Sequence, residues 1–228
     1  MCRLALLPTL AITAISLGPT PVVADPAAEL ALTFGRNLER GENFKRIESS
    51  FALPVAGSFG LQFDLATSKY QTADTITPSG ALHLTWGVSE DLTLGVFAFG
   101  ETPNSETVAG VGLEVAYRTE AVNVDAYAAA AQAVNDSSVS GSRVGIDVTY
   151  KVGGDVSILG GAASDSLDGT DRSLVYLGAG WQFNDAAAAI ARIGQTDVGD
   201  GVLTLGVTLN TAPVTFGRRD AFAGLRGY

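Results

Sequence analysis

The chain has 228 residues, of which 46% are hydrophobic and 17% charged, and its formal net charge is −10. An ordinary soluble domain carries about 25% charged residues, and a disordered chain is much less apolar, so a mainly disordered protein is excluded. A single cysteine, Cys2, excludes a disulfide framework and a cysteine-based zinc site. The acidic balance argues against binding of nucleic acid by bulk electrostatics.

Residues 1–24 have the parts of an export signal. Arg3 is the positive end, residues 4–17 form an apolar core, and small residues at 22–24 precede the expected cleavage site. This core is too short to be a spanning helix, which needs about 20 residues. Cleavage would remove the only cysteine. It would also remove one of the 14 basic residues and none of the 24 acidic ones, which leaves a charge of −11.

Apolar and polar residues alternate along most of the remaining chain, as in strands with one apolar face. Within residues 82–88, for example, Leu82, Leu84, Trp86 and Val88 oppose His83, Thr85 and Gly87. The pattern predicts twelve strands, at residues 29–35, 45–55, 58–69, 80–89, 91–100, 107–118, 121–133, 143–152, 155–163, 173–183, 186–194 and 202–210. An even number leaves both termini on the same side of a barrel.

Three of these segments leave a helix as an alternative. The alternation at residues 29–35 is short, and residues 126–133 and 186–191 are rich in alanine, which favours helix. We interpret all three as strands, the alanine-rich pair because small residues alternate with larger ones around them.

The predicted connections alternate in length along the chain. The short ones are 56–58, 89–91, 119–120, 153–155 and 184–185, and the long ones are 36–44, 70–79, 100–107, 134–142, 164–172 and 195–201. Short turns on one side and longer loops on the other are typical of outer-membrane barrels. A soluble β-sandwich or lipocalin-like barrel is the alternative, but its polar face should carry many charges. We therefore expect an all-β fold, a single antiparallel transmembrane barrel at residues 25–210.

Two hairpins, at residues 86–100 (WGVSEDLTLGVFAFG) and 177–194 (LGAGWQFNDAAAAIARIG), resemble those of Gram-negative outer-membrane barrel and small porin families. The likeness covers about residues 45–210. It implies location in the outer membrane, contact with its lipid, and passage of small solutes without chemistry. Such families usually end on a strand whose last residue is aromatic, as Tyr228 is here.

The end of the chain departs from that family pattern. Counting back in twos from Tyr228 gives a poor lipid-facing series: Arg226, Gly224, Phe222 and Asp220. We therefore expect residues 201–210 to close the barrel and residues 211–228 to be an extension. This extension carries three arginines against one aspartate on an otherwise acidic chain. We hypothesise that it folds back to the mouth or into the lumen; a loosely held tail is the alternative.

Alternation assigns a set of charged residues to the lumen face. The set is Arg46, Glu48, Asp64, His83, Glu114, Arg118, Asp125, Arg143, Asp147, Lys151 and Arg192. Without the histidine, five are acidic and five are basic. Opposite charges on facing walls of a conducting pore are one interpretation. A lumen closed by paired charges, in a structural or surface-interaction barrel, is the other. A third hypothesis is a hydrolase using His83 as a base, but no strand offers a nucleophile pattern. We expect that the protein is not an enzyme.

The predicted outer loops are acidic, with Glu39, Glu42, Asp74, Glu101, Glu106, Asp136, Asp165, Asp168, Asp171, Asp197 and Asp200. Asp165, Asp168 and Asp171 surround a glycine and could hold Ca²⁺ through oxygen ligands. Their spacing does not match an EF-hand loop, and a solvated loop is the alternative. The sequence has no phosphate-binding loop, zinc motif or nucleotide fingerprint, so we expect no cofactor. The solute and the oligomeric state stay open.

Overall fold

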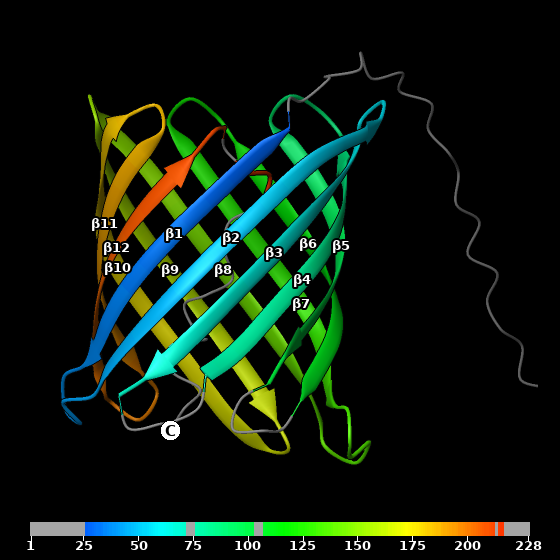
Figure 1. Cartoon of the computed structure of the whole chain (residues 1–228), viewed down its shortest axis with the longest axis vertical. Helices are drawn as coiled ribbons and strands as arrows, with labels where there is room; N and C mark the ends of the chain where they lie inside the picture. The colour runs from blue at the N-terminus through cyan, green and yellow to red at the C-terminus, as the bar shows by residue number, and fades with distance from the viewer. Residues whose placement is uncertain (1–25, 72–75, 103–106, 213, 217–228) are drawn as a thin grey trace, which may run out of the picture.

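The computed structural model describes residues 26–71, 76–102, 107–212 and 214–216. They form one closed barrel of twelve antiparallel strands, strongly tilted against its axis (Figure 1). The strands are β1 (Ala27–Asn37), β2 (Asn43–Ala56), β3 (Phe59–Tyr70), β4 (Ile76–Gly87), β5 (Leu92–Glu101), β6 (Val108–Arg118), β7 (Val122–Ala133), β8 (Ser140–Gly153), β9 (Val156–Leu167), β10 (Thr170–Asn184), β11 (Ala187–Thr196) and β12 (Gly201–Asn210). The predicted leader, residues 1–24, lies outside the described residues, as do residues 217–228 of the predicted extension.

The barrel closes by pairing of its first and last strands. Each strand pairs with its neighbours in sequence, and β1 also pairs with β12, from Glu29 opposite Asn210 to Asn37 opposite Val202. Residues 201–210 are therefore the closing strand, as the sequence indicated. Closure leaves no free edge among these strands that could pair with another chain.

All twelve predicted strands are present, and the alternative of a helix is wrong in each of the three ambiguous segments, which lie in β1, β7 and β11. The prediction of a long loop at residues 164–172 is also wrong. There β9 and β10 are joined by a two-residue turn, Asp168-Gly169, with φ angles of 51° and 70°. Both values lie in the left-handed region that a tight hairpin turn of this kind requires.

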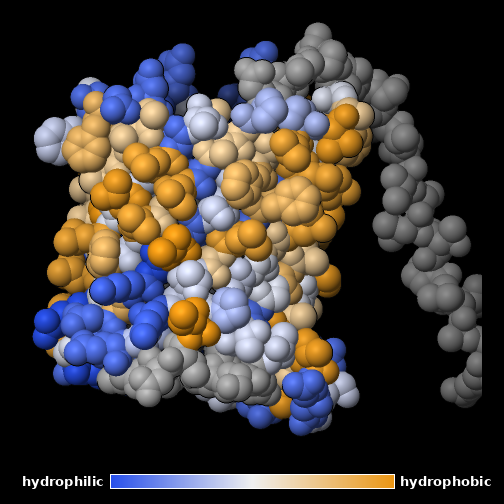
Figure 2. Space-filling model, viewed as in Figure 1, coloured by the Kyte–Doolittle hydropathy of each residue, from blue (hydrophilic) through white to orange (hydrophobic). Residues whose placement is uncertain are grey.

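The outside of the barrel is apolar. Large hydrophobic side chains are exposed on every strand except β7, and examples are Leu113 and Leu177, each 66% exposed. Figure 2 shows this apolar surface covering much of the visible wall. Such a surface would be unstable in water and is matched to hydrocarbon, where a closed barrel leaves no backbone group unpaired. The fold and this exterior together make the protein an outer-membrane barrel.

No helix in the described part of the chain is long and apolar enough to cross a membrane.

Aromatic rings lie flat against the inner wall, over glycines of neighbouring strands. A Cβ atom added to Gly112 would lie 2.4 Å from the ring of Phe97, and one added to Gly35 would lie 2.0 Å from the ring of Phe44. A larger residue at either position would push the ring away from the wall. These glycines therefore decide how far the rings extend into the lumen, and they account for part of the high glycine content, 27 residues.

Candidate functional site

His83 lies at the centre of a polar cluster inside the barrel. It projects inward from β4 and is fully buried. Its Nδ1 lies 2.8 Å from a carboxylate oxygen of Glu114 on β6, and its Nε2 lies 3.0 Å from one of Asp64 on β3. The ring of Phe97 stacks on the imidazole at 5.7 Å. Among the described residues these partners are carboxylates and rings rather than a hydroxyl nucleophile, so the geometry does not favour the hydrolase hypothesis.

The segment after β12 enters the lumen and packs on this cluster. Phe216 is 2% exposed, and its ring stacks on His83 with centroids 6.0 Å apart. The amide nitrogen of Phe216 donates to Oε1 of Gln62 at 3.0 Å, and Nε2 of Gln62 donates to the carbonyl of Phe216 at 3.2 Å. Arg118 Nη2 donates to the carbonyl of Thr215 at 3.1 Å. Two strands, β3 and β6, thus hold the backbone of this segment inside the barrel.

Most of the other predicted lumen charges form ion pairs. Arg46 Nε lies 3.0 Å from Glu48 Oε1, and both side chains are buried on β2. Arg118 Nη2 lies 2.6 Å from Asp125 Oδ1, a pair between β6 and β7. Lys151 is different, because it lies exposed near the end of β8.

The contacts of Arg143 show that two predictions about the outer loops are wrong. Its Nη2 lies 3.0 Å from Glu101 Oε1, and its Nε lies 3.4 Å from Asp165 Oδ1. Both carboxylates were expected outside, but β5 extends to Glu101 and β9 extends past Asp165, and alternation turns both side chains inward. The guanidinium also lies over the ring of Phe99, 4.4 Å from its centroid.

The corrected strands change the balance of charge on the inner face. Alternation over their full lengths also turns Glu29 and Arg172 inward. The inward acidic residues of the described strands are Glu29, Glu48, Asp64, Glu101, Glu114, Asp125, Asp147 and Asp165, and the basic ones are Arg46, Arg118, Arg143, Lys151, Arg172 and Arg192. Eight acids against six bases give the lumen a small negative charge, where the sequence had indicated an even balance.

Asp165, Asp168 and Asp171 do not converge on one point. Asp165 pairs with Arg143 inside the barrel, Asp168 lies in the tight turn, and Asp171 lies exposed on β10. Among the described residues, no group of three or more His, Cys, Asp or Glu side chains is placed to hold a metal ion.

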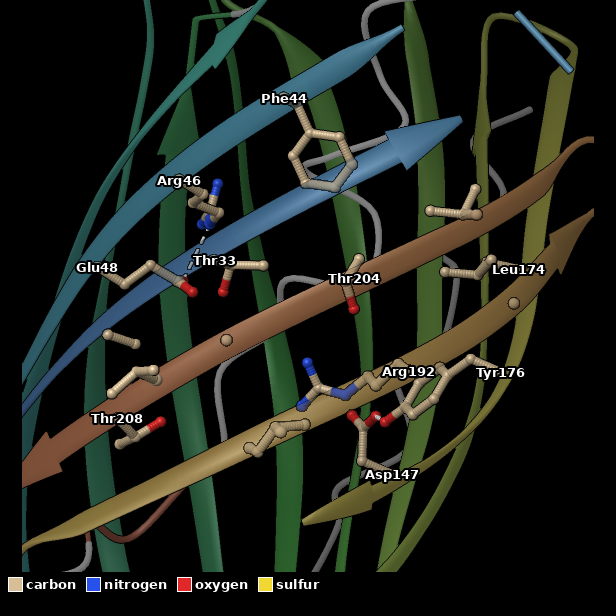
Figure 3. A pocket seen from close by; sticks show the side chains of 16 residues that line it. Thr33, Phe44, Arg46, Glu48, Asp147, Leu174, Tyr176, Arg192, Thr204 and Thr208 are labelled. Carbon is tan, nitrogen blue, oxygen red and sulfur yellow. Dashed lines mark hydrogen bonds and ion pairs between the residues drawn. The ribbon is translucent and has the colours of Figure 1, made fainter. Parts of the chain in front are cut away.

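The opposite half of the lumen contains a cavity of about 80 Å³. Its walls come from β1, β2, β8 and β10 to β12, and its polar lining includes Thr33, Arg46, Asp147, Tyr176, Arg192, Thr204 and Thr208 (Figure 3). The Tyr176 hydroxyl donates to the Asp147 carboxylate, and the Arg192 guanidinium lies 5.4 Å from the Tyr176 ring centroid. Arg192 Nε is buried and has no hydrogen-bond partner among the described residues. This half of the lumen therefore has a cavity and, in Arg192 Nε, a hydrogen-bond donor with no partner among the described residues.

Sequence reasoning missed Gln62, which binds the backbone of the C-terminal segment. Gln62 lies on the same face of β3 as Asp64, so its inward direction follows from alternation. Phe216 carries no such signal, because it lies beyond the last strand and outside any period. Its position depends on the path of the chain after Asn210.

Solved outer-membrane channels share this fold. The NanC porin is 10% identical over 79% of this chain and 98% of that chain, with a TM-score of 0.67. The KdgM porin is 11% identical over 79% and 98%, with a TM-score of 0.59. An outer membrane channel from Pseudomonas putida F1 is 13% identical over 85% and 98%, with a TM-score of 0.56. No protein-family model matches the chain. No curated protein matches it either.

Proposed function

We propose that this barrel is a narrow outer-membrane channel for passive passage of small solutes, without chemistry. The cavity beside Arg192 is the observation that carries the proposal. Its wall mixes polar and apolar side chains, and it is large enough for a few water molecules. A barrel that serves only as a scaffold gains nothing from an unfilled polar space, whereas a channel needs one.

The passage runs along one half of the lumen. Phe216 and the His83 cluster fill the half formed by β3 to β6, while the cavity lies against β1, β2, β8 and β10 to β12. Threonine hydroxyls and the two arginines in its wall can replace part of a solute's hydration shell. Because the wall offers both charged groups and hydroxyl groups, it suits small polar solutes of several kinds.

The inner charges favour small cations and neutral solutes. Rings of charge set the selectivity of a pore, and here eight inward acids outnumber six inward bases. The KdgM porin, which shares the fold, has been solved in complex with disordered oligogalacturonate. An acidic chain of that kind would meet a lumen of net negative charge in this protein, where Arg46, Arg118 and Arg143 are already paired with carboxylates.

A non-conducting barrel is the second candidate, and one observation favours it. The backbone at Phe216 donates one hydrogen bond to the buried side chain of Gln62 and accepts another from it. If the segment held at Phe216 never leaves the lumen, the barrel is closed and serves as a scaffold or a surface for interaction.

Single-channel recording in a planar bilayer separates the two candidates. The mature chain is compared with a chain truncated after Asn210, under a KCl gradient. We expect a small conductance with a reversal potential on the cation-selective side, and a larger conductance after truncation. Barrel assembly is checked by the migration shift between heated and unheated samples in detergent gels. Silence of both assembled forms would establish the non-conducting barrel, and anion selectivity would refute the charge argument.

A further inference from the structure

Three basic side chains face outward on consecutive strands. They are Arg36 on β1, Lys45 on β2 and Lys69 on β3, and all three are exposed. Each continues an outward apolar series, for example Leu30, Leu32 and Phe34 on β1. By the same alternation, no other described strand carries a basic residue on its outward face. We call these three residues the outer basic patch.

The patch brings like charges together, with no partner for them in the part of the chain that the structure describes. Lys45 and Lys69 lie directly opposite each other on paired strands, and Arg36 lies opposite Asn43, two residues from Lys45. Like charges in such positions destabilise a sheet. None of the three has an ion pair or a side-chain hydrogen bond among the described residues. Asn43, between them, donates to Gln71 at 2.7 Å. An anion bound to these three side chains would offset the repulsion between their charges.

The patch lies at the end of the barrel with the longer connections. At this end the connection after β1 is residues 38–42 and the one after β7 is 134–139, whereas the opposite end has two-residue turns at 57–58 and 154–155. Longer loops face the cell exterior in barrels of this type. Figure 2 shows a hydrophilic area at the lower left, where β1 and β3 end and β2 begins (Figure 1). The patch is therefore at the level of the outer-leaflet headgroups.

The surface next to the patch suits acyl chains. Phe34 pairs directly with Lys45, and Phe34, Ile47 and Leu65 are 54%, 49% and 60% exposed. A ligand that fits both parts has phosphate groups attached to several fatty chains. Cations at a membrane surface attract anionic headgroups.

We propose that the outer basic patch binds the phosphates of the phosphorylated glycolipid of the outer leaflet. Arg36, Lys45 and Lys69 contact the phosphates, and the acyl chains pack on the apolar wall below. This site is independent of the lumen and of solute passage. It orients the β1–β3 side of the barrel toward a bound lipid.

Lipid retention measured by native mass spectrometry tests the proposal. The purified mature barrel is titrated with diphosphorylated lipid A and with the same lipid after dephosphorylation. We expect the diphosphorylated lipid to bind at least about tenfold more tightly, and the double variant Lys45→Gln/Lys69→Gln to lose about tenfold of that affinity. The loss should shrink as salt is raised, because exposed charges are screened.

A matched control removes two cations from elsewhere. Lys151→Gln/Arg172→Gln has the same net charge as the test variant but changes only inward-facing positions, so it should retain lipid A like the wild type. Equal loss in both variants would overturn the proposal, because bulk charge would then explain binding. Phosphatidylglycerol bound as tightly as lipid A, or displacement of lipid A by millimolar inorganic phosphate, would also overturn it. Gel migration confirms that each variant is assembled.

Discussion

Replacing Phe216 with alanine should release the C-terminal segment from the lumen. The ring is 2% exposed, stacks on His83 and lies against the inner wall at Gly95. Fully burying a phenylalanine side chain stabilises by roughly 1.5–3 kcal/mol, and an aromatic contact adds roughly 0.5–1.5 kcal/mol. The two backbone bonds to Gln62 stay in the variant. The loss is therefore only the contribution of the ring, about 2–4.5 kcal/mol.

A loss of this size shifts the equilibrium between the seated and the displaced segment by about 30- to 1,600-fold, because each 1.4 kcal/mol is a factor of ten. In single-channel recordings the Phe216→Ala channel should spend correspondingly more time in a higher-conductance state. Phe63→Ala is the matched control, since Phe63 lies on β3 beside Gln62 but faces lipid, 40% exposed. If assembled Phe216→Ala conducts like the wild type, with the same dwell times, the ring does not restrict the passage and the reasoning fails.

Three further predictions concern the wall, the orientation and the charges of the barrel. Leu205→Arg places a charge on the lipid face at the middle of β12 and should destabilise the barrel by about 2–4 kcal/mol. The side chain of the neighbouring variant Thr204→Arg points into the cavity, so this variant should be less destabilised. Equal unfolding midpoints of the two variants in urea would contradict the assigned faces. A cysteine at Ser138 should react with an impermeant thiol reagent on intact cells and one at Asp185 should not; the reverse result would invert the topology. Arg143→Gln removes the partner of two buried carboxylates and should shift the reversal potential further toward cations; no shift would place this cluster outside the conducting path.

The outer face of the barrel could be predicted from the sequence because lipid imposes a strict period. Along β8, Val144, Ile146 and Val148 alternate with inward residues without a break, so one register satisfies every position. Strand ends were less certain, and the error at residues 164–172 shows why. Asp165 and Asp171 resemble loop residues, yet the first pairs with Arg143 across strands, a partner that no local pattern reveals.

The lumen could be predicted only in part. Alternation indicated which charges turn inward, because side-chain direction depends on local backbone alone. It could not indicate which charges pair, since Arg143 meets Glu101 from a strand three positions away in the barrel. Nor could it place Phe216, whose contacts to Gln62 and His83 bridge more than half the chain.

The seam between β1 and β12 determines when the barrel can form. Glu29 pairs with Asn210 across almost the whole described chain, so the final contact has the largest sequence separation and the highest entropic cost of loop closure. Until β12 is delivered, β1 and β11 both expose unpaired backbone groups that hydrocarbon cannot satisfy. The chain must therefore cross the periplasm before the barrel closes, and closure and membrane insertion must occur together. A chain that ends before β12 should be lost to aggregation or proteolysis rather than persist as a smaller barrel.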